Sequence, residues 1–142
     1  RIMEAVLNSW FQNPKTLNLV SPNLTYPFKF KQWVSKYYNN NGKEIITKVL
    51  KQNNWIIGHV SIRIEKDNLH VYHLFIQPKH RRKGLAKKIF SEVKKIAMIL
   101  KKSTVSLKVS KGNHNAIQIY LEMGYKKEDH IKNKNIKMIK YL

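Results

Sequence analysis

A short basic turn at residues 81–86, with the sequence Arg-Arg-Lys-Gly-Leu-Ala, combines residue types that can hold phosphate. It follows the apolar run 71–76 and the break at Pro78, and it opens a helical pattern that continues to about Lys102. The backbone N–H groups of a first helical turn lack intrahelical partners, and the helix dipole adds about half a positive charge there. Gly84 allows a ligand to approach the backbone closely, and Ala86 keeps the next turn small. The turn therefore predicts a site for the diphosphate of a cofactor.

The elements that must position this turn can be read from the spacing of apolar residues, since alternation predicts strands and a spacing of three to four predicts helices. The expected helices cover residues 2–12, 29–38, about 85–102 and 113–123. The expected strands cover residues 44–52, 55–65, 69–76, 104–109, 125–129 and 136–141. Two polar turns join the first three strands into an antiparallel meander. The chain is thus predicted to be one α/β domain over residues 1–142, and its helical start at Arg1 leaves open that a first strand is missing.

The composition excludes several classes of site. With 42% hydrophobic and 11% aromatic residues, 142 residues can form a folded domain with its own core. The absence of cysteine excludes disulfides, thiolate catalysis and Cys-ligated zinc. No apolar run approaches the ~20 residues that span a bilayer, so we expect a cytoplasmic protein without membrane association. The net charge of +20 favours binding to nucleic acid, but the 24 lysines are spread along the whole chain, and AT-rich coding explains them at least as well.

A second motif lies about thirty residues beyond the basic turn. It reads Asn-His-Asn-Ala-Ile-Gln-Ile-Tyr over residues 113–120, followed by Gly124 and Tyr125. Together, the two motifs and the order of elements resemble the GNAT superfamily of acyl-CoA-dependent N-acetyltransferases. That family has Arg or Gln, two residues, Gly, one residue, then Gly or Ala, which matches Arg81, Gly84 and Ala86. The resemblance covers residues 44–142 well and the first forty weakly.

The resemblance implies a GNAT-like α/β fold, in which a mixed, mostly antiparallel sheet of about six or seven strands is flanked by about four helices. It also implies acetyl-CoA as the acetyl donor, without a metal. The strand ending at Ile76 would splay from the strand 104–109, so that the pantetheine arm pairs with its exposed backbone. The cofactor-binding residues implied are Leu74, Phe75, Ile76, Arg81, Arg82, Lys83, Gly84, Leu85, Ala86, Lys87, Asn113 and Tyr120.

Three residues are expected to act in catalysis. In the family, the amide at the position of Leu74 stabilises the oxyanion that forms on the thioester carbonyl, and a tyrosine at the position of Tyr120 protonates the departing thiolate. His70 occupies a strand position where several members place a catalytic Glu or His, which makes it the first candidate for the general base. Because side chains alternate between the two faces of a strand, His70 should share a face with Leu74 and Ile76, and His73 should lie on the other face. A bulge between these residues would reverse this parity. His73 is the second candidate, and ordered waters without a dedicated base are the third possibility.

The remaining histidines, His59, His80, His114 and His130, show no ligand spacing and are expected on the surface. The acceptor is expected to be a primary amine of a small molecule, an amino acid or a protein, with polycations disfavoured by the positive charge of the chain. Two functions from other classes stay open: a basic nucleic-acid-binding module, and a non-catalytic sensor of coenzyme A. The family often forms dimers, so a homodimer is also considered.

Overall fold

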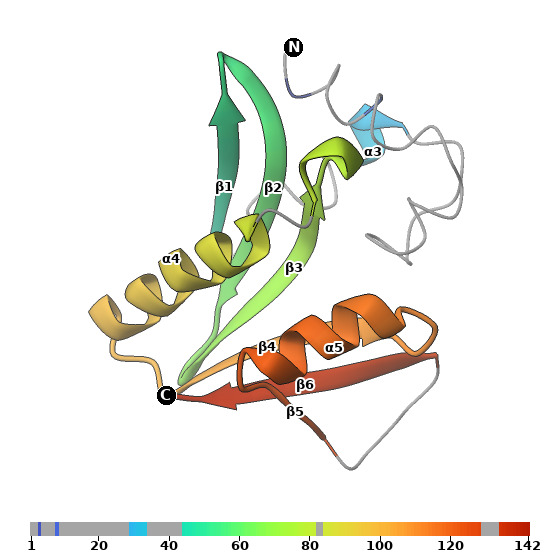
Figure 1. Ribbon diagram of the computed structural model, residues 1–142. Coiled ribbons are helices and arrows are strands. Elements are labelled where there is room, and N and C mark those ends of the chain that lie inside the picture. Colours follow the sequence, from blue (N-terminus) through green and yellow to red (C-terminus); the bar gives the residue numbers. More distant parts are fainter. Residues whose placement is uncertain (1–2, 4–7, 9–28, 34–43, 82–83, 129–133) are drawn as a thin grey trace.

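The computed structural model describes residues 3, 8, 29–33, 44–81, 84–128 and 134–142. Figure 1 shows the elements in chain order, with the labels used below. The helices are α3 (Phe30–Trp33), the short 3-10 helix η2 (Pro78–His80), α4 (Leu85–Ile99) and α5 (His114–Glu122). The strands are β1 (Ile45–Gln52), β2 (Trp55–Ile64), β3 (Asn68–Ile76), β4 (Thr104–Ser110), β5 (Lys126–Lys127) and β6 (Asn135–Tyr141).

The six strands form one sheet in the order β1-β2-β3-β4-β6-β5. Neighbours are antiparallel except β3 and β4, which run parallel and are connected through α4. The β1–β2 hairpin turns tightly because Asn53 and Asn54 both adopt positive φ, a conformation that asparagine tolerates better than most residues. The expected α/β fold with a mixed, mostly antiparallel sheet is therefore confirmed.

The sheet opens into two arms between β3 and β4. Their ladder holds only from Asn68 opposite Thr104 to Val71 opposite Leu107, and the strands then diverge. In Figure 1 the β1–β2–β3 arm rises away from the β4–β6–β5 arm, with α4 lying across the first arm and α5 along the second. The expected splay of these two strands is thus present.

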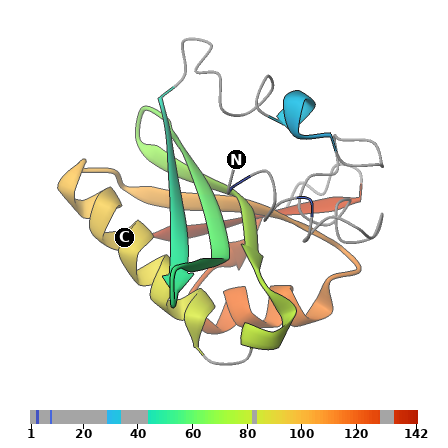
Figure 2. The ribbon, with the colours of Figure 1, turned by 90° about the horizontal axis from the view of Figure 1, so that it is seen from above.

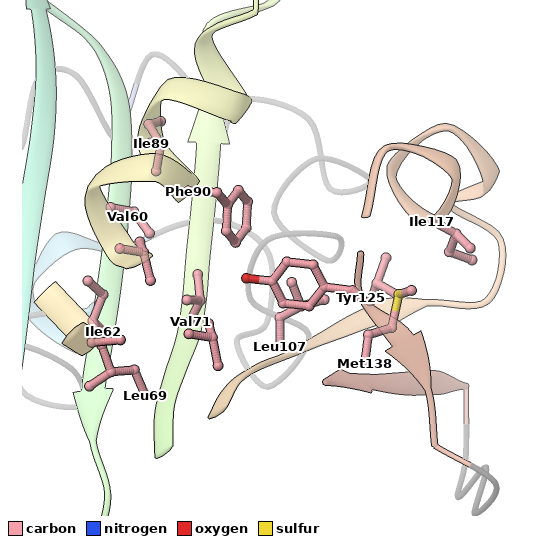
Figure 3. Packing of buried hydrophobic residues seen from close by; sticks show 14 of the residues in the cluster. Val60, Ile62, Leu69, Val71, Ile89, Phe90, Leu107, Ile117, Tyr125 and Met138 are labelled. Atoms are coloured by element: carbon pink, nitrogen blue, oxygen red, sulfur yellow. The ribbon is translucent and has the colours of Figure 1, made fainter. Parts of the chain in front are cut away.

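The hydrophobic core joins both arms on the face that α4 and α5 cover. Figure 3 shows Phe90 of α4 close to Tyr125, with Val71 and Leu107 of the two diverging strands beside them. Ala97 of α4 and Met138 of β6 have no exposed surface. Figure 2 shows α3 on the opposite side of the sheet from α4 and α5.

The predicted elements agree with the structure to within a few residues, with two exceptions. The last-but-one strand, expected over 125–129, is only Lys126–Lys127. Of the first two predicted helices, the one over 2–12 lies outside the described residues apart from Met3 and Asn8, and the one over 29–38 is described only as Phe30–Trp33. Gly124, just after α5, adopts the left-handed conformation that glycine often takes at a helix C-terminus, with φ 93°. In the described part of the chain, no helix is long and apolar enough to cross a bilayer.

Candidate active site

A β-bulge interrupts β3 at His73 and Leu74. On β2, His59 pairs with Phe75 and Ser61 pairs with Tyr72, so Val60 alone faces two residues of β3. His73 takes the strained left-handed conformation, with φ 49°, which accommodates the extra residue.

The bulge reverses which side chains of β3 face the core. Before it, Leu69 and Val71 belong to the core, and after it, Ile76 does, with Leu74 packed against the core. The parity that the sequence predicted without a bulge is therefore wrong, because His70 does not share a face with Leu74 and Ile76. The bulge that the sequence analysis allowed as a cause of reversed parity is present.

The bulge also directs the amide of Leu74. The His59 ring nitrogen Nδ1 lies 2.9 Å from the His73 carbonyl oxygen, so this carbonyl is directed toward the side chain of His59. In a trans peptide, the N–H of the next residue points the opposite way. The Leu74 N–H is accordingly directed away from the side chain of His59. Leu74 has no register partner on β2 or β4.

His59 was expected on the surface, and this expectation is wrong. The side chain is 1% exposed, and burial lowers its pKa while its hydrogen bond to the His73 carbonyl opposes that shift. The signal that we missed is the position of His59 in the middle of the apolar strand β2. Side chains on both faces of this strand are buried, so a histidine there has no access to water.

Arg81 fastens the basic turn to the end of β3. Its Nε donates a 2.8 Å hydrogen bond to the carbonyl of Ile76, and its guanidinium lies 5.1 Å from the centre of the Phe75 ring. Burial lowers the pKa of Arg81, although the guanidinium stays charged. The side chain thus holds the geometry of the turn as well as supplying charge.

Gly84 is the N-cap of α4 and adopts φ 74°. A Cβ at this position would meet no atom within 4 Å, so the space beside the glycine is open. The first helical hydrogen bond runs from the Lys88 N–H to the Gly84 carbonyl, and the amides of Leu85, Ala86 and Lys87 therefore precede it and are available to an anion. Arg82 and Lys83, also expected to bind the cofactor, lie outside the described residues.

The second motif builds α5 and presents Tyr120 to the first arm. The Asn113 side chain caps the helix by accepting a 3.3 Å hydrogen bond from the Ala116 N–H. Tyr120 packs edge-on against Phe90 of α4 and Tyr125, with ring centres 5.6 and 6.1 Å away. Burial raises the pKa of Tyr120 to about 12, so its hydroxyl is protonated at neutral pH.

His70 belongs to a polar network at the other end of β3. Its Nδ1 lies 2.8 Å from Ser106 Oγ on β4, and Ser106 Oγ accepts a 2.8 Å bond from Asn68 Nδ2. The same Asn68 amide donates to Glu65 at 2.7 Å, and Arg63 forms a 3.0 Å ion pair with Glu65. The sequence analysis predicted none of these partners of His70, because only the register between β3 and β4 brings them together.

The environment of His70 disfavours its charged form. Burial, together with nearby Arg63, Lys108 and Lys137, lowers the pKa of His70 to about 4, and Glu65 partly opposes this shift. The imidazole is therefore neutral at pH 7.

The structure thus places several of the predicted cofactor residues at one corner and sets His70 apart. Ile76, Arg81 and the start of α4 form one continuous corner at the end of β3, and Tyr120 reaches α4 from the second arm. His70 lies four residues before Leu74, on the other face of the strand. Among the described residues, no group of three or more His, Asp or Glu side chains could hold a metal ion.

Comparison with known proteins gives matches at the level of family and fold. A family model described as an acetyltransferase (GNAT) domain matches residues 26–141. The coenzyme A complex of PaiA N-acetyltransferase from Thermoplasma acidophilum is similar, with 16% identity, a TM-score of 0.75, and coverage of 99% of this chain and 94% of that one. The GNAT domain of S. lividans PAT has 12% identity, a TM-score of 0.82, and coverage of 99% and 85%.

A GNAT family acetyltransferase from Elizabethkingia anophelis, with acetyl-CoA bound, has 14% identity, a TM-score of 0.67, and coverage of 92% and 93%. These identities establish likeness of fold alone. Among curated proteins, no relative matches the sequence. With four fifths of its length matched by the family model, and with the bulged, splayed strands and the glycine-capped helix in place, the chain belongs to the GNAT acetyltransferase family.

Proposed function

We propose that this chain transfers the acetyl group of acetyl-CoA to a primary amine. Members of the GNAT family use acetyl-CoA, and two similar structures contain coenzyme A or acetyl-CoA. The observation that carries the proposal is the gap between β3 and β4, which adjoins the N-terminus of α4. That corner offers a strand edge that β4 does not pair beyond Val71, for a pantetheine arm, and the first amides of α4 for a diphosphate.

The cofactor would bind along the corner in an extended form. The amides of Leu85, Ala86 and Lys87 would hold the diphosphate, with Arg82 and Lys83 supplying charge. Leu74, Phe75 and Ile76 would pair with the pantetheine amides as a strand does, and the Asn113 amide nitrogen, which capping leaves free, would bind the same arm. Arg81 would keep this corner in shape through its bond to Ile76.

The reaction would proceed by direct attack of the amine on the thioester carbonyl. A C–N bond forms, the C–S bond breaks, and the leaving thiolate takes a proton from Tyr120, which regains one from the amine through solvent. The Leu74 N–H would donate to the oxygen on which negative charge develops, and removal of such a donor typically costs about 100- to 1,000-fold in rate. Because its pKa is about 12, Tyr120 reaches this step protonated.

The assignment of His70 as the general base has weaker physical support. An amine with a pKa near 10 would have to give its proton to an imidazole whose pKa is about 4, which is uphill by about 8 kcal/mol. We therefore propose that ordered waters remove the proton and that His70 contacts the acceptor in another way. kcat/KM should then rise with pH until the amine itself is deprotonated, with no change across pH 6–7 from His70.

Thermal unfolding with and without acetyl-CoA tests the cofactor assignment, and assays with a panel of amines test transfer. Acetyl-CoA should raise the Tm of the native chain and have no effect on Gly84→Glu, whose carboxylate would occupy the open space at the start of α4. No stabilisation of the native chain would overturn the proposal. Stabilisation without transfer to any amine would favour a non-catalytic sensor of coenzyme A.

A further inference from the structure

A chain of hydrogen bonds connects His70 to Ser106, Asn68 and Glu65 and favours one tautomer of the imidazole. The Asn68 amide nitrogen has two hydrogens and donates them to Glu65 Oε1 and Ser106 Oγ, at 2.7 and 2.8 Å. Two neighbours set the orientation of the Asn68 side-chain amide. The Glu65 carboxylate can only accept, so it takes the Nδ2 side, and the Thr104 hydroxyl donates to Oδ1 at 2.9 Å. Ser106 Oγ accepts from Asn68 and can donate its own hydrogen to His70 Nδ1, 2.8 Å away. In this arrangement neutral His70 carries its proton on Nε2 and offers a donor there.

Cations gather around His70 on the face of the sheet opposite α4 and α5. Arg63 on β2 pairs directly across from His70, while Lys108 on β4 pairs directly across from Lys137 on β6. Lys108 shares the face of Ser106, since the two residues are two apart on one strand. Like charges placed opposite each other on a sheet repel.

The acidic groups nearby do not neutralise this face. Glu65 is engaged by both Arg63 and Asn68, and Glu128 reaches Lys137 only at 3.9 Å. No acidic partner of Lys108 is present among the described residues. The face therefore holds a neutral donor and an excess of positive charge at the junction of the two arms, which is an arrangement that suits a carboxylate.

We propose that a carboxylate surface, made of His70, Arg63, Lys108 and Lys137, binds an acidic group of the acceptor while the acceptor amine lies at the bulge. This inference rests on the proposed function and names the acceptor class. His70 Nε2–H donates to the carboxylate, and the lysines supply charge. Ser106 is a positioning residue, because it holds the tautomer of His70 and does not touch the acceptor.

The spacing sets the size of the acceptor. His70 lies four residues before Leu74, and Lys108 lies two residues beyond Ser106 on the parallel strand. At about 3.3 Å per residue, the carboxylate is about 7 to 13 Å from the reacting amine. An α-amino acid is too short for this span. A peptide with Asp or Glu at its second or third residue fits, as does a linear amino acid of about six carbons.

Matched acceptors test the preference. The native enzyme should acetylate the amidated peptide Ala-Ala-Glu with a kcat/KM about tenfold above that for amidated Ala-Ala-Gln, mainly through KM, and 6-aminohexanoate should exceed 6-aminohexanamide similarly. Comparing the two pairs tells whether a peptide or a small amino acid is favoured. Lys108→Gln and Lys137→Gln should each reduce the preference about threefold to fivefold. Lys94→Gln, an equal charge change on the exposed face of α4, should leave it unchanged.

A second measurement does not depend on turnover. The ¹⁵N NMR spectrum of histidine-labelled protein should show His70 as the Nε2–H tautomer at pH 7, and acetyl-Ala-Ala-Glu amide should shift this N–H signal while the Gln analogue does not. Ser106→Ala should mix the tautomers and raise KM for the acidic peptide, and Ser106→Thr, which keeps the hydroxyl, should restore both.

These outcomes separate the inference from the proposed function. Equal acetylation of the Glu and Gln peptides, with acetyl-CoA binding intact, would overturn the carboxylate surface and leave the enzyme assignment standing. Absence of both acetyl-CoA binding and acetylation would overturn the function. The NMR titration then still decides the surface, because an Nδ1–H tautomer or equal shifts from both acetylated peptides would contradict it.

Discussion

At the scale of single residues, Gly84 combines an unusual backbone with open space. Its φ of 74° is costly for any residue with a Cβ, yet that Cβ would touch nothing. Gly84→Ala should therefore destabilise the free protein by about 1 kcal/mol through the backbone alone, which lowers Tm by about 3 °C. Acetyl-CoA affinity should fall at least tenfold, because the methyl group enters the space that the diphosphate needs. Thermal unfolding and isothermal titration measure the two effects.

Gly112 supplies the matched control. A Cβ there would lie 4.0 Å from Ser110 Oγ, and the residue does not have the left-handed backbone of Gly84. Gly112→Ala should leave both Tm and acetyl-CoA affinity close to their native values. An unchanged affinity in Gly84→Ala would contradict the placement of the diphosphate at this turn.

Tyr120 allows its packing and its chemistry to be separated. Its ring contacts Phe90 and Tyr125, and these contacts survive in Tyr120→Phe. We expect Tm to change by less than about 2 °C while kcat falls about 10- to 100-fold, since only the hydroxyl that we propose as the proton donor is removed. Tyr125→Phe alters a hydroxyl in the same aromatic cluster and should keep kcat within about twofold. Equal kcat losses in the two variants would show that cluster packing, and not proton transfer, is being measured.

At the scale of elements, the β2–β3 hairpin holds two buried histidines whose protonation opposes folding. Burial lowers the pKa of His59, and burial with nearby cations lowers that of His70 to about 4. The unfolded chain binds these protons below pH 6.5, so stability is complete above pH 6.5 and falls as the pH drops toward 4. Protonation of His70 alone lowers the free energy of unfolding by an amount that approaches about 3 kcal/mol near pH 4. Burial raises the pKa of Glu65, but its bonds to Asn68 and Arg63 outweigh burial and lower it, so Glu65 adds a further loss of stability only below about pH 4.5.

Thermal unfolding between pH 7.5 and 4.5 measures this loss. His70→Gln should be less stable at pH 7.5 but should lose clearly less Tm on acidification than the native chain. His114→Gln, at an exposed position on α5, should follow the native curve. A native Tm that does not change over this range would contradict the buried, neutral state of His70.

How much of the fold the sequence predicts depends on how local each feature is. Strand alternation and the helical stripe of α4 are local, and they were predicted within a few residues. The bulge position is not local, because it depends on how β3 pairs with β2, and a shift of one residue moved His70 to the other face. The partners of His70 come from β4, 36 residues away. The cofactor corner was therefore predictable from its motifs, whereas the surroundings of His70 were not.

At the scale of the whole molecule, the proposed cofactor site and the proposed carboxylate surface lie at different ends of the junction between the two arms. The corner at the end of β3 faces the start of α4, where an anionic cofactor can enter, while the polar network lies where the arms still pair. Lysines are present on α4, β1, β4, β5 and β6 and do not gather in a single stripe. This distribution favours a general attraction for anions over a dedicated nucleic-acid surface.

The net charge of +20 predicts an unusual response to salt. Self-repulsion destabilises a compact chain, and the described ion pairs offset it little, because all three have side chains at least 36% exposed. Screening should weaken the repulsion more than the ion pairs. We therefore expect Tm to rise by several degrees between 10 and 300 mM NaCl, in the absence of acetyl-CoA.

Reducing the charge tests whether repulsion is the cause. The double variant Lys51→Gln and Lys94→Gln changes two exposed lysines on β1 and α4 and lowers the net charge from +20 to +18. Because self-repulsion grows with about the square of the net charge, the rise of Tm with salt should shrink by about a fifth, while Tm at 10 mM NaCl should increase. A Tm that falls with salt in the native chain would show that ion pairs outweigh repulsion. RNA that binds at 50 mM salt should be released by 300 mM if the same diffuse charge attracts it, whereas retention at 300 mM would indicate a specific nucleic-acid site.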